Sequence, residues 1–340
     1  MKSLQVNFSF CNVLLLATLV LVHISCKNNL KTSSEKVSKK EVVSVIKPTE
    51  SLKRAKQLNS NCYTDSGKAS EAGTRVWCWS DVKITEDLNS ATNFFSSNHL
   101  AVNSHCNNGM VTGSGDRLYF KVNPTTPTAQ EWCKYDFNYR AEIREHPSDV
   151  DHPVGTEQWF GWDYKFGEDY EADAFNEWIM WQVHGSFKSP ANPLISLWVA
   201  KTNMAKKTNT AGEIFVTNAA INSKNHKYTP TGIVPKAGQT LDIVVHVVWG
   251  DENTGLYEVW IDDKLIYSEQ ERTVYQEEPI GGYAKWGIYK WKWQSASNIA
   301  KSASEGIIQL NTSMGPLRVL MRRPGDQDYL QNSFALVKPK

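Results

Sequence analysis

Three short segments of the chain place polar side chains at every second position. The polar members are, in chain order, Arg140, Glu142 and Arg144, then Gln182 and His184, then Lys285 and Tyr289. Side chains two residues apart on a β-strand point to the same face of the sheet. If the three segments are neighbouring strands, one sheet face therefore presents guanidinium, carboxylate, amide, imidazole, ammonium and phenol groups together.

Such a set suits β-elimination at a 4-linked uronate, in which the hydrogen on carbon 5 is removed and the bond from carbon 4 to oxygen breaks. The charge that grows on the carboxylate must be stabilised by donors, a role for Arg140, Arg144 and Gln182. A base must reach carbon 5, and an acid must protonate the leaving oxygen. We expect His184 to be the base, because imidazole titrates near neutral pH. Tyr289 is then the acid, or both acid and base if one face of the sugar carries both the hydrogen and the leaving group. No step requires a metal or another cofactor.

Each segment also has a purely structural explanation. The arginines and Glu142 suit a salt-bridge ladder, His184 a hydrogen-bonded structural histidine, and Tyr289 a core tyrosine. The combination of a base and an acid candidate favours a site. Lys285 then becomes a substrate contact that also lowers the pKa of Tyr289 by its charge, and Gly287 leaves room for a ligand between them.

In this order the three segments resemble the heparin lyase I-type polysaccharide lyase family and, more distantly, the jelly-roll alginate lyases. Those families share Arg-x-Glu-hydrophobic-Arg, Gln-x-His and Lys-x-Gly-x-Tyr strands, matched here by residues 140–144, 182–184 and 285–289. Residues 244–264 resemble the family's penultimate hairpin, and the resemblance spans residues 110–340. It implies a β-jelly roll with a substrate groove, His184 as base, Tyr289 as acid, and Gln182 with Arg140 or Arg144 at the uronate carboxylate.

The sequence departs from the alginate lyases in the third segment. Ala284 stands where Phe is usual, and Trp286 replaces a smaller residue. We therefore expect a glucuronate or iduronate polymer, such as ulvan, glucuronan or a heparin-like glycan, over alginate. The residues expected to contact this anionic polysaccharide are Lys285, Glu142, Asn108, Trp286, Trp291 and Arg322.

Two other functions fit the same kind of fold. A glycoside hydrolase needs two carboxylates that flank the scissile bond; Glu142 and Glu177 are available, but no strand has the paired acidic spacing. A non-catalytic glycan-binding protein would use some of the 13 Trp and 13 Tyr residues as sugar platforms, although core packing is the usual role of such residues.

The elements that must position the site are short runs rich in β-branched and aromatic residues, each bounded by turn residues. The predicted strands are residues 117–122, 158–164, 178–184, 194–199, 241–249 and 256–261. Residues 250–255 join two of them as a hairpin loop, and Asp262-Asp263 makes the next tight turn. No long stretch has a helical apolar period. The prediction is an all-β protein, a jelly-roll or concanavalin-like two-sheet sandwich with a concave substrate groove.

The 340 residues divide into three parts by composition. Residues 1–26 resemble a signal peptide of the lipoprotein type, with an apolar run too short for an ordinary membrane helix and lipidation at Cys26. Residues 27–60 have the composition of a flexible tether, and residues 61–340 form one catalytic domain. We expect an exported monomer that contacts the membrane only through a lipid at the cell surface or in the periplasm, or else a secreted protein.

The remaining composition bears on cofactors and partners. Cys62, Cys78, Cys106 and Cys133 are disulfide candidates in an oxidising compartment, with three pairings open; no spacing among them is typical of zinc. The residues Asp251, Glu252 and Asn253 offer oxygens for a structural calcium ion, with a solvated turn as the alternative. No other metal is expected. The net charge of +1 gives no indication of nucleic acid as a partner.

Overall fold

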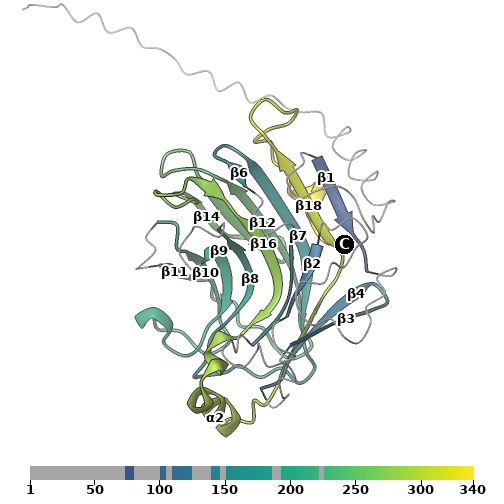
Figure 1. Cartoon of the computed structure of the whole chain (residues 1–340), viewed down its shortest axis with the longest axis vertical. Helices are drawn as coiled ribbons and strands as arrows, with labels where there is room; N and C mark the ends of the chain where they lie inside the picture. Colours follow the sequence, from purple (N-terminus) through teal and green to yellow (C-terminus); the bar gives the residue numbers. More distant parts are fainter. Residues whose placement is uncertain are drawn as a thin grey trace, which may run out of the picture. The chain divides into compact units, whose positions relative to one another are not determined.

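The computed structural model describes residues 73–79, 100–104, 109–124, 139–145, 151–185, 193–221 and 226–340. These residues form two large antiparallel sheets with few helices, so the predicted all-β, jelly-roll class is confirmed (Figure 1). In this part of the chain no helix is long and apolar enough to cross a membrane. The predicted division at residues 26 and 60 lies outside the described residues and stays a prediction.

The seven-stranded sheet has the order β11-β10-β9-β8-β16-β5-β2. Its strands are β2 (Leu100–Ser104), β5 (Arg140–Glu145), β8 (Trp178–His184), β9 (Pro193–Val199), β10 (Ile214–Asn218), β11 (Lys227–Pro230) and β16 (Tyr283–Tyr289). β16, from late in the chain, lies between β8 and β5. The three segments that carry the candidate residues are thus neighbouring strands.

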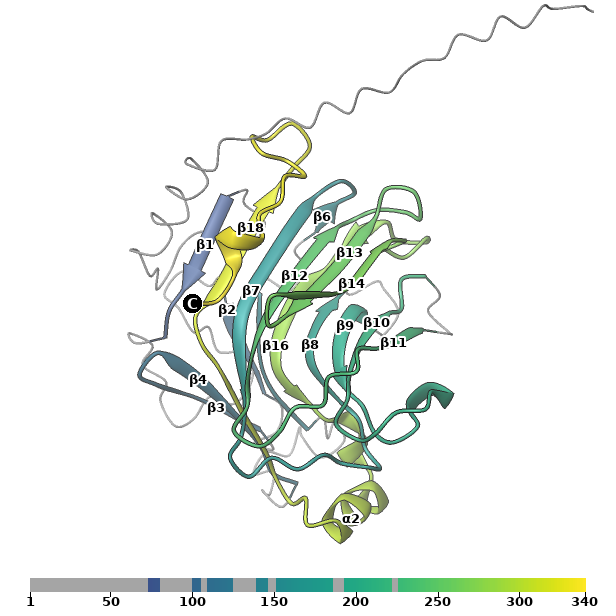
Figure 2. The ribbon, with the colours of Figure 1, turned by 180° about the vertical axis from the view of Figure 1, so that it is seen from behind.

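The nine-stranded sheet runs β14-β13-β12-β7-β17-β4-β3, with β18 paired to β7 and β1 to β18; Figure 2 shows β7, β12, β13 and β14 side by side. Its strands are β1 (Gly73–Trp77), β3 (Gly109–Ser114), β4 (Arg117–Val122), β7 (Glu157–Phe166), β12 (Thr240–Val248), β13 (Leu256–Ile261), β14 (Lys264–Gln270), β17 (Leu310–Met314) and β18 (Leu317–Arg322). A further pair is β6 (His152–Pro153) with β15 (Ile280–Gly281).

The core lies between the two large sheets and is rich in aromatic side chains. Trp162 of β7 stacks on Trp181 of β8 with ring centroids 6.0 Å apart and meets Trp286 of β16 edge to face at 6.4 Å. On β5, Ala141 and Ile143 point into this core. The polar residues between them therefore face away from it, as strand alternation requires.

The predicted strands and turns agree with the structure. The loop 250–255 joins β12 to β13, and the Asp251 carboxylate accepts hydrogen bonds from the backbone of Asn253 and Thr254. Asp262 and Asp263 have φ values of 49° and 67°, which two-residue hairpin turns of the I′ type require.

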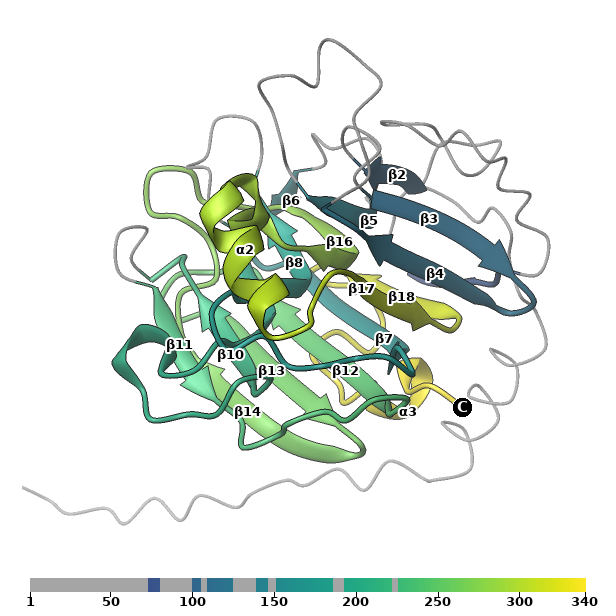
Figure 3. The same ribbon diagram turned by 90° about the horizontal axis from the view of Figure 1, so that it is seen from below.

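The helical segments were not predicted. They are η2 (Met204–Lys206), η3 (Trp291–Gln294), α2 (Ala296–Ser304) and α3 (Phe334–Val337). Figures 1 and 2 show α2 at the lower end of the sandwich, and Figure 3, seen from below, shows it in front of the strands. The backbone of this corner continues directly from Tyr289, so it matters for the site.

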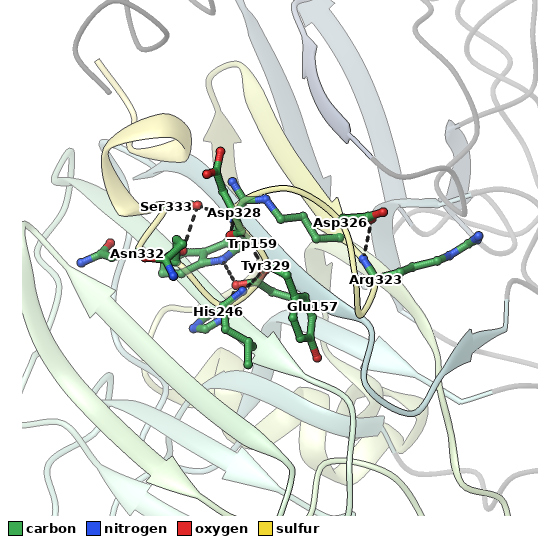
Figure 4. A network of polar contacts seen from close by, with 12 residues as sticks. Glu157, Trp159, His246, Arg323, Asp326, Asp328, Tyr329, Asn332 and Ser333 are labelled. Atoms are coloured by element: carbon green, nitrogen blue, oxygen red, sulfur yellow. Dashed lines mark hydrogen bonds and ion pairs between the residues drawn. The ribbon is translucent and has the colours of Figure 1, made fainter. Parts of the chain in front are cut away.

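The C-terminal segment packs on the outer face of the nine-stranded sheet, around a network shown in Figure 4. The buried Glu157 carboxylate accepts hydrogen bonds from Trp159 Nε1 (2.9 Å) and the Leu330 backbone (3.1 Å) and lies 3.1 Å from His246 Nε2. The other ring nitrogen of His246 lies 2.8 Å from the Glu258 carboxylate. His246 also stacks on Trp159 at 3.8 Å. The network ties β7, β12 and β13 to the chain end.

Candidate active site

The candidate residues share one face of the seven-stranded sheet, here named the site face. In the strand register Lys285 lies opposite Arg144 on one side and Gln182 on the other. Tyr289 lies opposite Arg140. The predicted neighbourhood of the three strands is confirmed, because β8, β16 and β5 are consecutive.

Gly287 was predicted to leave room for a ligand. In the structure it is instead required by the backbone geometry of β16. Its φ is +132°, and the register shifts between Trp286 and Tyr289. A Cβ atom at this position would lie 2.2 Å from the backbone oxygen of Ala141. The close approach of β16 to β5 thus requires glycine.

Glu142 is the buried centre of the site, with a relative exposure of 1%. Its Oε1 accepts a hydrogen bond of 2.7 Å from Gln182 Nε2, and its Oε2 lies 2.9 Å from Arg140 Nε. Burial raises the pKa of Glu142, although Arg140, Lys285 and the Gln182 hydrogen bond oppose this. Both carboxylate oxygens of Glu142 face protein groups. Glu142 therefore positions Gln182 and Arg140, and is not the substrate contact that was predicted from the sequence.

Arg144 and Lys285 are the cations of the site that form no ion pair with a described residue. Lys285 is only 3% exposed, and neither side chain forms a hydrogen bond or ion pair with another residue that the structure describes. Burial lowers the pKa of Lys285 to about 7, with Arg140 and Arg144 lowering it further and Glu142 opposing. Burial likewise lowers the pKa of Arg144. The positive charge of the buried Lys285 is costly unless an anion pairs with it.

His184 lies at the end of β8. Its Nδ1 is 3.0 Å from the backbone oxygen of Gly185. Because a carbonyl oxygen only accepts, Nδ1 carries the proton in this contact, and Nε2 is the nitrogen able to receive one. Tyr283 lies opposite His184, with ring centroids 5.8 Å apart.

Tyr289 lies at the other end of β16, six residues beyond Tyr283. At about 3.3 Å per residue this is roughly 20 Å of strand, with Arg144, Lys285 and Gln182 between the two ends. The Arg140 guanidinium carbon lies 4.0 Å above the centre of the Tyr289 ring. Lys285 Nζ instead lies 5.1 Å from the Tyr283 ring. The cation beside Tyr289 is therefore Arg140, not Lys285 as predicted.

Two predicted substrate contacts lie elsewhere. Trp286 is fully buried in the core, on the opposite face of β16 from Lys285. Arg322 ends β18 of the other sheet, where its Nη1 donates to Asp328 O (2.7 Å) and Ser333 Oγ (2.8 Å). Both predictions were wrong. Strand alternation already assigns Trp286 to the opposite face, and Arg322 stabilises the C-terminal segment.

Trp291 does lie beside the site. It begins η3, and its ring centroid is 5.6 Å from that of Tyr289. Cys78 is disulfide-bonded, and its partner lies outside the described residues. The other predicted residues outside them are Asn108, Cys26, Cys62, Cys106 and Cys133.

The loop considered for calcium uses its oxygens within the turn. Asp251 Oδ1 accepts from Thr254 Oγ1 at 2.8 Å, in addition to its backbone donors, and Glu252 pairs with Arg272. Among the described residues no group of three or more His, Cys, Asp or Glu side chains is placed to hold a metal ion. These contacts agree with a solvated turn.

Sequence reasoning missed Tyr283 and the support behind Tyr289. Tyr283 has the same parity as Lys285 and Tyr289, so alternation alone would have placed it on the site face. Burial raises the pKa of Tyr283, while Arg144 and Arg140 oppose this. The buried Lys290 that follows Tyr289 forms an ion pair of 2.9 Å with Asp173, a contact between distant segments that no local pattern predicts.

Comparison with known proteins places the chain in a family. The family model described as "Polysaccharide lyase" matches residues 106–308, more than half of the chain. No curated protein sequence matches it. Similar solved structures include an endo-β-1,4-glucuronan lyase from the fungus Trichoderma reesei, with 16% identity, a TM-score of 0.48, and coverage of 70% of this chain and 93% of that chain. Another is the family 7 alginate lyase A1-II′ with a bound product, with 13% identity, a TM-score of 0.42, and coverage of 61% and 80%. On the family match, the chain belongs to the polysaccharide lyase family and is a polysaccharide lyase.

Proposed function

We propose that the enzyme cleaves 4-linked uronate polymers by β-elimination and leaves an unsaturated uronate at the new chain end. The observation that carries this proposal is the pair formed by Arg144 and Lys285. The half-buried Arg144 and the buried Lys285 lie in register on the site face, and neither forms an ion pair with a carboxylate among the described residues. Their charge suits the carboxylate of one uronate residue.

The chemistry follows from the groups around this pair. Arg144, Lys285 and the Gln182 amide stabilise the negative charge that develops on the uronate carboxylate when carbon 5 loses its hydrogen. His184 Nε2 takes that hydrogen as a proton, or Tyr289 takes it where the hydrogen and the leaving oxygen lie on the same face of the sugar. The electron pair forms the double bond between carbons 4 and 5, the bond from carbon 4 to oxygen breaks, and Tyr289 protonates the leaving oxygen.

The burial of two residues weakens the sequence argument for glucuronate or iduronate polymers over alginate. Ala284 and Trp286, the two departures from the alginate lyases, are both fully buried in the core. They contact no substrate and so do not discriminate against alginate. We keep glucuronate or iduronate polymers (ulvan, glucuronan or a heparin-like glycan) as the proposed substrates, to be compared directly with alginate.

The test is incubation with a panel of pure uronate polymers, while the ultraviolet absorbance of the conjugated double bond is followed. We expect new absorbance with at least one polymer, and no absorbance from the His184→Ala variant. New reducing ends without this absorbance would indicate a hydrolase instead. Binding without either product would indicate a glycan-binding protein. The hydrolase alternative has little support, because Glu142 is enclosed and Glu177 pairs with Lys201 at 3.1 Å.

We also propose that the enzyme is an exported monomer, held at the cell surface or in the periplasm by a lipid on Cys26. The apolar run that ends at Cys26 supports this. Expression with a radiolabelled fatty acid tests it: label on the wild-type protein, and none on the Cys26→Ser variant, is the expected result.

A further inference from the structure

The side chains of the site face change from polar to apolar at the cross-strand row that contains Tyr289. In register with Tyr289 lie Ile179 of β8, Trp198 of β9 and Phe215 of β10. The row through Lys285, four residues earlier, continues instead through Gln182, Ser196 and Thr217. One row across the sheet is polar and cationic, and the next beyond the bulge is apolar and aromatic.

Three rings pack together along this second row, and we name them the aromatic platform: Trp291, Trp198 and Tyr228. Trp198 belongs to the row itself, whereas Tyr228 lies in register with Thr217 of the polar row and packs its ring edge-on against Trp198. The Trp291 and Trp198 centroids are 4.8 Å apart, and those of Trp198 and Tyr228 are 5.6 Å apart. Trp291 and Tyr228 are half-buried and Trp198 is 6% exposed. The platform is continuous with Tyr289 through Trp291.

We propose that the aromatic platform binds the sugar on the leaving side of the scissile bond, and that this sugar is uncharged. The inference rests on the proposed function. Tyr289 protonates the oxygen that departs with the leaving sugar, so that sugar must lie beside Tyr289. The uronate whose bond breaks has its carboxylate at Arg144 and Lys285, in the other row. The substrate class is thus a polymer in which uronates alternate with neutral sugars.

The two lysines beside the platform already face a carboxylate. Lys201 and Lys292 share that of Glu177, at 3.1 and 3.7 Å. A second carboxylate placed here would lose water against indole rings and would compete with Glu177 for its cations, which is unfavourable. A neutral sugar instead stacks its apolar C–H face on the rings.

The platform is held rigidly from behind. Lys290, between Tyr289 and Trp291, is 1% exposed; its Nζ pairs with Asp173 at 2.9 Å and donates to the Asn176 backbone oxygen at 2.7 Å. Its backbone N–H donates to Tyr139 O at 2.9 Å. The Trp293 indole donates to Ser302 Oγ of α2 at 2.8 Å. Trp291 therefore stands in a preorganised place, which favours binding.

The experiment compares two polymers of 4-linked glucuronate: heparosan, in which it alternates with N-acetylglucosamine, and glucuronan, which contains glucuronate alone. Initial rates of unsaturated uronate formation give kcat and KM for the wild type, Trp291→Ala and Trp291→Phe. We expect the wild type to prefer heparosan. Trp291→Ala should lower kcat/KM on heparosan roughly tenfold, mainly through KM, and change glucuronan cleavage by less than about threefold. Trp291→Phe should fall between.

Trp260→Ala is the matched control, because it removes a half-buried indole from the nine-stranded sheet, and it should leave both values unchanged. Equal efficiency of the wild type on the two polymers, or equal losses on both in Trp291→Ala, would overturn the inference and leave the proposed function standing. If neither polymer is cleaved, the wider panel of uronate polymers decides the proposed function, and calorimetric binding of a heparosan oligosaccharide decides the platform. Binding lost in Trp291→Ala supports the platform, and unchanged or absent binding refutes it.

Discussion

At the scale of single residues, the site depends on which cations are paired. Glu142 neutralises Arg140 and holds Gln182, whereas Arg144 and Lys285 have no such partner in the described part of the chain. The residue types of this arrangement could be predicted from strand alternation. The pairing could not, because Arg140 and Arg144 are equivalent in sequence, both two residues from Glu142, and only the fold selects one of them.

Lys285 should make substrate binding dependent on pH near neutrality. Its pKa of about 7 in the free enzyme means that it is charged below this pH and neutral above it. Affinity for an anionic polymer should therefore fall as the pH rises through about 7. The measurement is 1/KM from pH 6 to pH 9. Lys285→Met should have weak affinity throughout, and Lys285→Arg should keep its charge over the whole range. A wild-type profile that Lys285→Met reproduces would contradict this assignment.

The two tyrosines on β16 can be separated by their hydroxyls. If Tyr289 donates the proton, Tyr289→Phe should lower kcat by about a thousandfold, within the range for loss of a general acid or base, and leave KM nearly unchanged. Tyr283→Phe should lower kcat less than about tenfold, because the variant keeps the ring beside His184. Single-turnover rates of product formation measure both. The reverse order of effects would make Tyr283, in register with His184, the acid.

At the scale of elements, strand β16 divides its side chains between two tasks. Trp286 packs in the core against Phe160 and Trp162, so Trp286→Ala should lower the free energy of unfolding by about 3–5 kcal/mol. Denaturant unfolding measures this loss. Trp286→Phe should lose less, and under folding conditions should keep the wild-type KM. A raised KM with unchanged stability would restore the sequence-based assignment of Trp286 to the substrate.

The strands were more predictable than the segments that connect them. Alternation and β-branched residues identified β8 and β13 at their observed bounds, and the Asp262-Asp263 turn follows from local chemistry. The corner after Tyr289 was missed, because η3 and α2 are short, with four and nine residues, and depend on the Lys290–Asp173 pair. The site hypothesis required β5, β8 and β16 to be neighbouring strands. The long-range pairing of β16 with the other two strands meets this requirement.

At the scale of the whole molecule, the two sheets separate stability from catalysis. The candidate catalytic residues belong to β5, β8 and β16, while the Glu157–His246–Glu258 network lies on the outer face of the nine-stranded sheet. Figure 4 shows Glu157 and His246 of this network. Burial alone would raise the pKa of Glu157, but hydrogen bonds from His246 and Trp159 hold it below its ordinary value of 4.5. The pKa of Glu258 is lowered in the same way, by His246 and Ser268 against burial.

This network should make the fold sensitive to acid. A carboxylate whose pKa is lower in the folded than in the unfolded protein contributes stability above its unfolded pKa, and this stability is lost as the pH falls through the folded pKa. The wild-type Tm should therefore fall below about pH 4.5.

His246→Phe keeps a ring to stack on Trp159 but removes both contacts to the carboxylates. It should lower the Tm at pH 7 and flatten the decline in acid. Its kcat and KM at moderate temperature should equal those of the wild type, because the site face is on the other sheet. An unchanged Tm profile would refute the role of the network, and a lost kcat in a folded variant would refute the separation of the two sheets.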